Sequence, residues 1–166
     1  MASKGVTTRM TETFGLRPEE EAQFAGRWAA GVGGGLAGGI AFGALLQATG
    51  GLPTIGALYG AETLVGGWVA HLFHSLLFGL AFAGLSTAAP FRQYAARVLP
   101  AMGLGIAYGV SLWLVLATVV MPLWLTAMGL QTPIGFDLVS LVGHVGFGAV
   151  LGATFPAFLR ATRPTG

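Results

Sequence analysis

Long apolar stretches alternate with short polar segments along this chain. Four of these stretches are long: they run from Trp28 to Gln47, Leu64 to Leu85, Val98 to Val120 and Leu138 to Leu159. A helix of roughly 20 apolar residues crosses the hydrocarbon core of a bilayer. The pattern therefore predicts an all-α integral membrane protein with four transmembrane helices and a membrane domain over residues 28–159.

The composition supports this reading and narrows the function classes. Of 166 residues, 54% are hydrophobic and only 8% are charged, whereas soluble domains average about 25% charged residues. The absence of cysteine excludes disulfides, thiolate metal sites and cysteine nucleophiles. The arginines are scattered, which argues against nucleic-acid binding, and no hydrolase, phosphate-loop or zinc-protease motif is present. We therefore expect a protein that is not an enzyme.

The basic residues predict the orientation of the chain in the membrane. With four spans, they all fall on one side: Lys4, Arg9, Arg17, Arg27, Arg92, Arg97, Arg160 and Arg163. The opposite loops hold Glu62 and Asp137 but no Lys or Arg. The positive-inside rule then places both termini in the cytoplasm of a multi-pass plasma-membrane protein, with an N-terminal segment over residues 1–27 and a tail over 160–166.

Within the N-terminal segment, we expect a mobile stretch to about Leu16 and then a helix start. Pro18 suits the first helical position, and the three glutamates that follow it complement the helix dipole.

The two halves of the chain resemble each other. GIAFG at 39–43 is echoed by GIAYG 66 residues later, and FG at 78–79 is echoed 69 residues later. The halves, about 28–85 and about 98–159, each cross the membrane twice. We therefore predict two parallel helical-hairpin repeats related by an axis along the membrane normal.

The two outer loops carry a second echo. LPTIGALYG at 52–60 matches MPLWLTAMG at 121–129, and each has proline near its start and glycine at its end. This arrangement predicts two short helices at the outer membrane surface, with Tyr59 and Trp124 at the interface. The alternative is that these segments extend the spans.

Small residues recur every fourth position in the predicted helices. Such faces allow close helix packing in membranes, so they predict a compact bundle or an oligomer seam. The packing glycines are Gly31, Gly35, Gly39 and Gly43 in the first span, Gly79 in the second, Gly105 and Gly109 in the third, and Gly148 and Gly152 in the fourth.

The 69-residue offset relates polar residues of the second and fourth spans. It pairs His71 with Ser140, and Ser75 with His144. If the small faces of these spans meet near Gly79 and Gly148, two reciprocal His–Ser hydrogen bonds form an interhelical polar clamp, each worth about 0.6 to 2 kcal/mol. His74 lies off that face and has no assigned partner.

A ligand-binding role for the three histidines is the alternative, because ionisable residues inside membranes mark function by default. His71 and His144 are candidate axial ligands of a haem b. All three histidines, with His74, are candidate ligands of a transition metal. We expect no cofactor as the first hypothesis, and haem b or a metal ion as the second.

Three segments resemble a family of small membrane proteins. ALYG, GWVAHLFHS followed by FG, and LVGHVGFGAVLG are similar to an uncharacterised family of four-span proteins common in haloarchaea and some bacteria. Some members carry a histidine kinase label, but this chain has no segment large enough for a kinase domain. The resemblance covers about residues 30 to 158, implies four spans and transfers no catalytic role.

Three functions follow as hypotheses. The first is a non-enzymatic auxiliary or scaffold subunit that associates through its glycine-rich faces with another copy or a larger membrane complex. The second is a haem-b or metal-binding subunit, and the third is an oligomeric channel or carrier.

Overall fold

The computed structural model describes residues 17–130 and 134–162. All regular structure in these ranges is helical. Four helices are long and apolar enough to cross a membrane: Glu19–Ala48, Leu64–Leu85, Val98–Ala127 and Leu138–Ala161. The prediction of an all-α protein with four membrane-length helices is confirmed. The expectation of a mobile stretch to Leu16 lies outside the described residues.

Two of the long helices begin at a side-chain cap. The Thr63 hydroxyl accepts from the Gly66 amide at 2.9 Å, and Asp137 accepts from two amides of the following turn. The predicted start at Pro18 is also observed. The elements are α2 (Pro18–Ala48), α3 (Leu52–Ala57), α4 (Leu64–Leu85), α5 (Ala89–Arg92), α6 (Val98–Leu112), η1 (Trp113–Val120), α7 (Met121–Ala127) and α8 (Leu138–Ala161).

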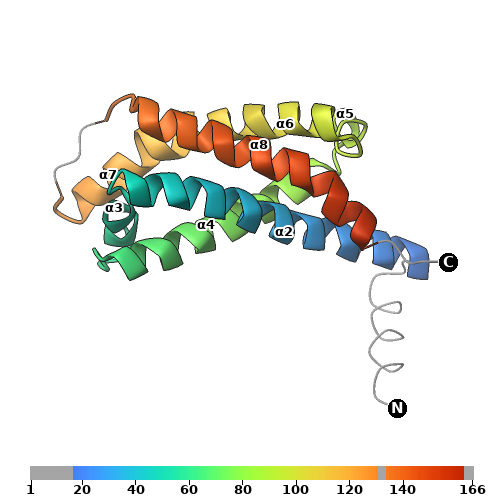
Figure 1. Ribbon diagram of the computed structural model, residues 1–166, viewed down its shortest axis with the longest axis horizontal. Coiled ribbons are helices and arrows are strands. Elements are labelled where there is room, and N and C mark those ends of the chain that lie inside the picture. Colours follow the sequence, from blue (N-terminus) through green and yellow to red (C-terminus); the bar gives the residue numbers. More distant parts are fainter. Residues whose placement is uncertain (1–16, 131–133, 163–166) are drawn as a thin grey trace, which may run out of the picture.

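The first and last long helices form the centre of the bundle. Helix α2 packs against both α4 and α8, and α6 packs against α8. Figure 1 shows this order, with α3 and α7 at one end and α5 at the other. Helices α4 and α6 are joined where the Tyr108 hydroxyl donates to the Phe78 carbonyl at 3.0 Å. The core between the helices combines aliphatic side chains with aromatic ones such as Phe82, Phe147 and Phe155.

Each hairpin closes on a glycine contact between its own two helices. A Cβ atom on Gly31 would lie 2.6 Å from the carbonyl oxygen of Gly79. A Cβ atom on Gly35 would lie 2.9 Å from the Cα atom of Gly79. In the second hairpin, Gly105 and Gly109 meet Gly148 in the same way. The small faces of α4 and α8 therefore meet α2 and α6, not each other as the sequence analysis assumed.

The two contacts recur at different offsets on the two sides. Gly79 and Gly148 are 69 residues apart, as the FG echo suggests, whereas the facing glycines of α2 and α6 (Gly31 and Gly105, Gly35 and Gly109) are 74 residues apart. The GIAFG and GIAYG segments are only 66 residues apart. The difference of eight residues is about two helical turns.

A second glycine face of α2 contacts α8. A Cβ atom on Gly34 would lie 2.9 Å from the Leu151 side chain, and one on Gly38 would lie 2.7 Å from the Phe147 carbonyl oxygen. The sequence analysis named only the face toward α4. Since α2 lies between two neighbours, it needs a small face for each.

The segments at 52–60 and 121–129, which echo each other in sequence, differ in structure. Helix α3 is a separate short helix, and Gly60 follows it with a φ of 71°. Helix α7 continues η1 without a break, so here the alternative prediction of an extended span is the one observed. Gly129 ends that helix with a φ of 88°, a conformation that favours glycine.

The π-helical form of η1 has a cause in the sequence. Pro122 lacks an N–H group, and its ring clashes with the carbonyl group four residues earlier in an α-helix. The preceding turns instead use longer-range bonds, as when the Met121 amide donates to the Leu116 carbonyl. The wider winding lets the helix pass through the proline.

Candidate functional site

His71 bonds to a neighbouring helix through its backbone. Its side chain is buried, and its Nε2 atom lies 2.9 Å from the carbonyl oxygen of Gly39 on α2. A carbonyl only accepts, so the Nε2–H group donates. A Cβ atom on Gly39 would collide with the Ser75 side chain, so the absence of a side chain there lets α4 lie close to α2. His71 thus joins α4 to α2 within the first hairpin.

The predicted polar clamp is not formed. The Ser75 hydroxyl donates to the His71 carbonyl at 2.8 Å, and the Nδ1 atom of His144 lies 2.8 Å from the Ser140 carbonyl oxygen. Each of these bonds stays within its own helix. The clamp required α4 and α8 to meet through their small faces, but those faces are covered by α2 and α6.

His74 pairs with a residue of the loop between α3 and α4. Its Nε2 atom lies 2.7 Å from the hydroxyl oxygen of Tyr59, which follows α3. The ring also stacks on Phe78, with centroids 6.0 Å apart. His74 therefore holds this loop against α4. The sequence analysis gave it no partner, although the aromatic Tyr59 lay nearby in the loop echo.

The ring of Phe42 lies in contact with both candidate haem ligands. Its centroid is 5.2 Å from that of His71 and 4.8 Å from that of His144. The ring also packs tightly against Gly143. A bis-histidine haem needs an open slot between its ligands, and here a phenylalanine occupies that region. The residues present therefore do not fit a haem b ligated by His71 and His144.

The histidines do not assemble a metal site either. Within residues 17–130 and 134–162, no three His, Asp or Glu side chains lie close enough to share one ion. His71 and His144 face Phe42, whereas His74 faces Tyr59. The predicted three-histidine site is therefore not formed among the described residues, because each imidazole has its own hydrogen-bond partner.

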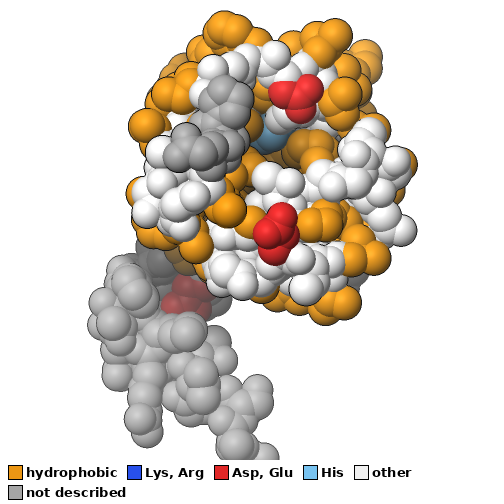
Figure 2. Space-filling model, turned by 90° about the vertical axis from the view of Figure 1, so that its left-hand side faces the viewer, with side chains coloured by type: hydrophobic (Ala, Val, Ile, Leu, Met, Phe, Trp, Pro, Cys, Tyr) orange, Lys and Arg blue, Asp and Glu red, His pale blue; other side chains and the backbone are white. Residues whose placement is uncertain are grey.

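The end of the bundle that carries α3 and α7 is hollowed. Figure 2 shows a histidine side chain on the floor of this hollow, between hydrophobic side chains, and two acidic side chains on the same face. The described acids of the outer segments are Glu62 and Asp137, both exposed. Deeper in the bundle, Phe82 and Phe155 are fully buried with centroids 5.4 Å apart. Aromatic packing thus fills the interior below the hollow.

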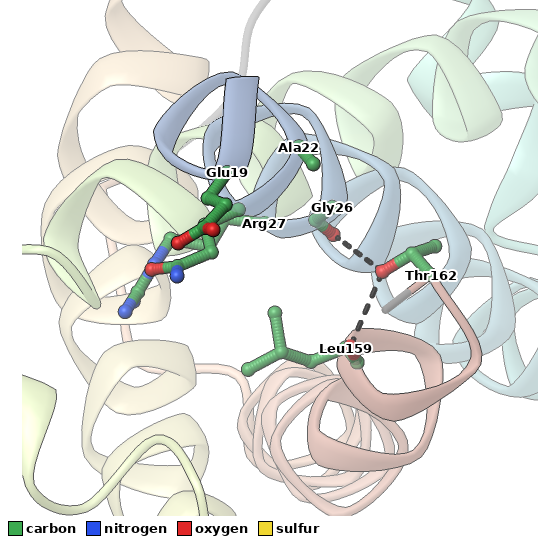
Figure 3. Close-up of a pocket in the computed structure, with 7 residues that line it drawn as sticks. Glu19, Ala22, Gly26, Arg27, Leu159 and Thr162 are labelled. Atoms are coloured by element: carbon green, nitrogen blue, oxygen red, sulfur yellow. Dashed lines mark hydrogen bonds between the residues drawn. The ribbon is translucent and has the colours of Figure 1, made fainter. Parts of the chain in front are cut away.

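A pocket of about 490 Å³, with both polar and apolar lining residues, lies at the opposite end, between the start of α2 and the end of α8. Glu19, Gln23 and Arg27 line it from α2, and Thr162 lines it beyond α8. In Figure 3, Glu19 and Arg27 lie on one side of the pocket, and the Thr162 hydroxyl bonds the Gly26 carbonyl on the other. The sequence analysis missed this pocket. Glu19, Gln23 and Arg27 recur at every fourth position, and this spacing indicates a polar face on one side of the helix.

The interior polar groups are well satisfied. In the described part of the chain, one buried polar side-chain atom has no hydrogen-bond partner, the Oε1 atom of Glu21 near the start of α2. Buried polar atoms that await a ligand are usually left without protein partners. The centre of the bundle holds none among the residues described.

Comparison with known proteins does not place the chain in a family. No protein-family model matches it, and no curated protein and no solved structure is similar to it. The resemblance to the four-span family therefore stays a prediction.

Proposed function

We propose that this chain is a non-enzymatic subunit of the plasma membrane that associates with further membrane helices. Every described arginine lies at or beyond the bundle end that carries α5 (Figure 1). By the positive-inside rule, this proposal therefore places both termini in the cytoplasm. Helix α3 then rests at the outer surface, where the exposed Tyr59 and Trp124 suit the interface.

The observation that carries the proposal is the closed interior. Large side chains fill the centre, and the glycine faces first predicted to bind partners are used within the chain itself. A catalytic or transport role needs a polar site or path at mid-membrane. The buried His71 and Ser75 side chains are bonded to backbone carbonyls instead, which favours a role that uses no such site.

A different small-residue face is available for association. Gly103, Ala107 and Ser111 are exposed along α6 at a spacing of four, and nothing lies within 4 Å of a Cβ atom on Gly103. Small residues at this spacing let a second helix approach closely. This face replaces the glycine faces as the proposed contact with a partner or another copy.

The test is the mass of the protein purified from native membranes in mild detergent. We expect a particle larger than one chain, which Ala107→Leu shifts toward the single chain by filling the α6 face. Ala81→Leu is the matched control, since Ala81 is exposed on α4 instead. A single chain in native extracts, a haem absorbance band, or solute flux in liposomes would each contradict the proposal.

A further inference from the structure

The pocket at the cytoplasmic end combines opposite charges in a way that suggests a ligand. It lies where α4 and α8 both end, since the Arg27 Nη1 group donates at 3.3 Å to the carbonyl of Ser86, just after α4. In a protein that crosses the membrane as proposed above, this level is that of the lipid headgroups. The ligand assignment rests on that proposed placement in the membrane.

We propose that this pocket binds the headgroup of a zwitterionic phospholipid. The phosphate lies against Arg27, and the amine lies against Glu19. A headgroup that carries both charges, such as phosphoethanolamine, is the chemical class that these two side chains recognise together.

Arg27 is equipped to hold a phosphate. A guanidinium has five N–H donors in a fork that matches phosphate oxygens, and the bond to Ser86 uses one of the two Nη groups. Among the described residues, no acid forms an ion pair with Arg27; the ion pair that is formed joins Arg17 to Glu20 at 3.1 Å. The half-buried Arg27 therefore retains donors for an anion.

Glu19 supplies the opposite charge without neutralising Arg27. The two residues are eight positions apart on α2, about 12 Å along the axis, which exceeds the spacing of ordinary helical ion pairs. Gln23 lies between them on the same face and lines the pocket too. An acid and a base that face one pocket without pairing match a ligand with separated charges.

The pocket has room for such a group. Its volume of about 490 Å³ lies within the range of small-molecule sites, about 300–1,000 Å³. Gly26 lets Thr162 close one side of the pocket, because a Cβ atom on Gly26 would lie 2.7 Å from the Thr162 hydroxyl oxygen. Leu159 and Ala22 give an apolar wall, which suits the glycerol and first acyl carbons of a lipid.

The experiment uses the full chain, stripped of lipid in detergent, with bound lipid counted by native mass spectrometry. The probes are phosphatidylethanolamine, phosphatidylglycerol, glycerophosphoethanolamine and inorganic phosphate. We expect one phosphatidylethanolamine to bind about tenfold more tightly than phosphatidylglycerol, as one charge-assisted contact predicts. Glycerophosphoethanolamine should compete weakly, and inorganic phosphate should not saturate the site.

Variants separate the two charges. Arg27→Gln should weaken both lipids about tenfold, whereas Glu19→Gln should remove only the preference for the amine. Arg160→Gln is the matched control, because Arg160 is exposed at the same end but does not line the pocket. Ala22→Phe fills the pocket and leaves Arg27 and its bond to Ser86 in place, so it tests the site even if Arg27→Gln fails to fold.

Three results would overturn the assignment: equal binding of the two lipids, binding unchanged by both Arg27→Gln and Ala22→Phe, or saturation by inorganic phosphate alone. Lipid binding is measured on the isolated chain. Its failure is therefore distinct from failure of the proposed association, which is read from particle mass.

Discussion

Single glycines decide how closely the helices of each hairpin approach. Gly79 meets the backbone of Gly31 and Gly35, and Gly148 meets that of Gly105 and Gly109. Backbone atoms, unlike a flexible side chain, cannot move aside for an added methyl group. The sequence analysis named all these glycines from their spacing, but spacing alone does not say which helix covers a face.

We expect Gly79→Ala and Gly148→Ala each to destabilise the protein by roughly 1–3 kcal/mol, because the added Cβ overlaps a facing backbone. Gly146→Ala is the control, since nothing lies within 4 Å of a Cβ atom there. It should be neutral or stabilising by up to about 1 kcal/mol through helix propensity. Unfolding in detergent measures all three variants, and equal losses would contradict the contact.

The histidines show why polar partners are hard to predict. A polar side chain inside a membrane needs a partner, and the sequence analysis sought one among other side chains. His71 instead bonds to the Gly39 carbonyl, which a sequence cannot mark because every residue carries one. Similarly, no residue pattern identified Phe42 as the ring between His71 and His144.

The observed bonds predict additivity between Ser75 and His144. Each side chain bonds within its own helix, so Ser75→Ala and His144→Phe should have independent effects on the free energy of unfolding. In a double-mutant cycle we expect coupling below about 0.5 kcal/mol. Coupling above 1 kcal/mol would restore the interhelical clamp.

At the scale of elements, the sequence predicts that Pro53 and Pro122 lie near helix starts, but not whether the helix before each proline ends or continues. Pro53 lies at the start of α3, as expected of a helix-initiating proline. Pro122 has the same local sequence setting, yet the chain runs through it as one continuous helix because η1 is wound as a π-helix. A local motif does not reveal whether the preceding residues are already helical.

Two tryptophans make different hydrogen bonds at the end of the bundle that carries α3 and α7. Trp124 donates from Nε1 to the Leu58 carbonyl at 2.9 Å and so links the two hairpins, whereas Trp113 donates to the Asp137 carbonyl within the second hairpin. Trp124→Phe should speed hydrogen exchange over residues 52–62, since one bond contributes about 0.5–1.5 kcal/mol. Trp113→Phe should leave that segment unchanged. Identical exchange in the two variants would argue against the link.

At the scale of the whole molecule, hydropathy predicted the four helices because bilayer thickness sets their length. The predicted Leu64–Leu85 span coincides with α4. Hydropathy does not predict which helices pack against each other. Helix α2 packs on both α4 and α8, and this depends on Gly34 and Gly38, which are indistinguishable in sequence from other glycines of that helix.

Because the chain contains no cysteine, its orientation can be measured directly. Glu62 and Gln93 are exposed in loops at opposite ends of the bundle. With cytoplasmic termini, a membrane-impermeant maleimide should label Glu62→Cys in intact cells and Gln93→Cys only after permeabilisation. The reverse pattern would place the termini outside.

The pairing of α2 with α8 has a consequence for biosynthesis. Each hairpin closes between long helices that are close together in the sequence. The α2–α4 pair can therefore form its contacts as soon as both helices have left the ribosome. The second face of α2, with Gly34 and Gly38, has no partner until α8 is synthesised. The bundle therefore cannot close before α8 has been made, and until then this face of α2 is open to lipid or to an insertion chaperone.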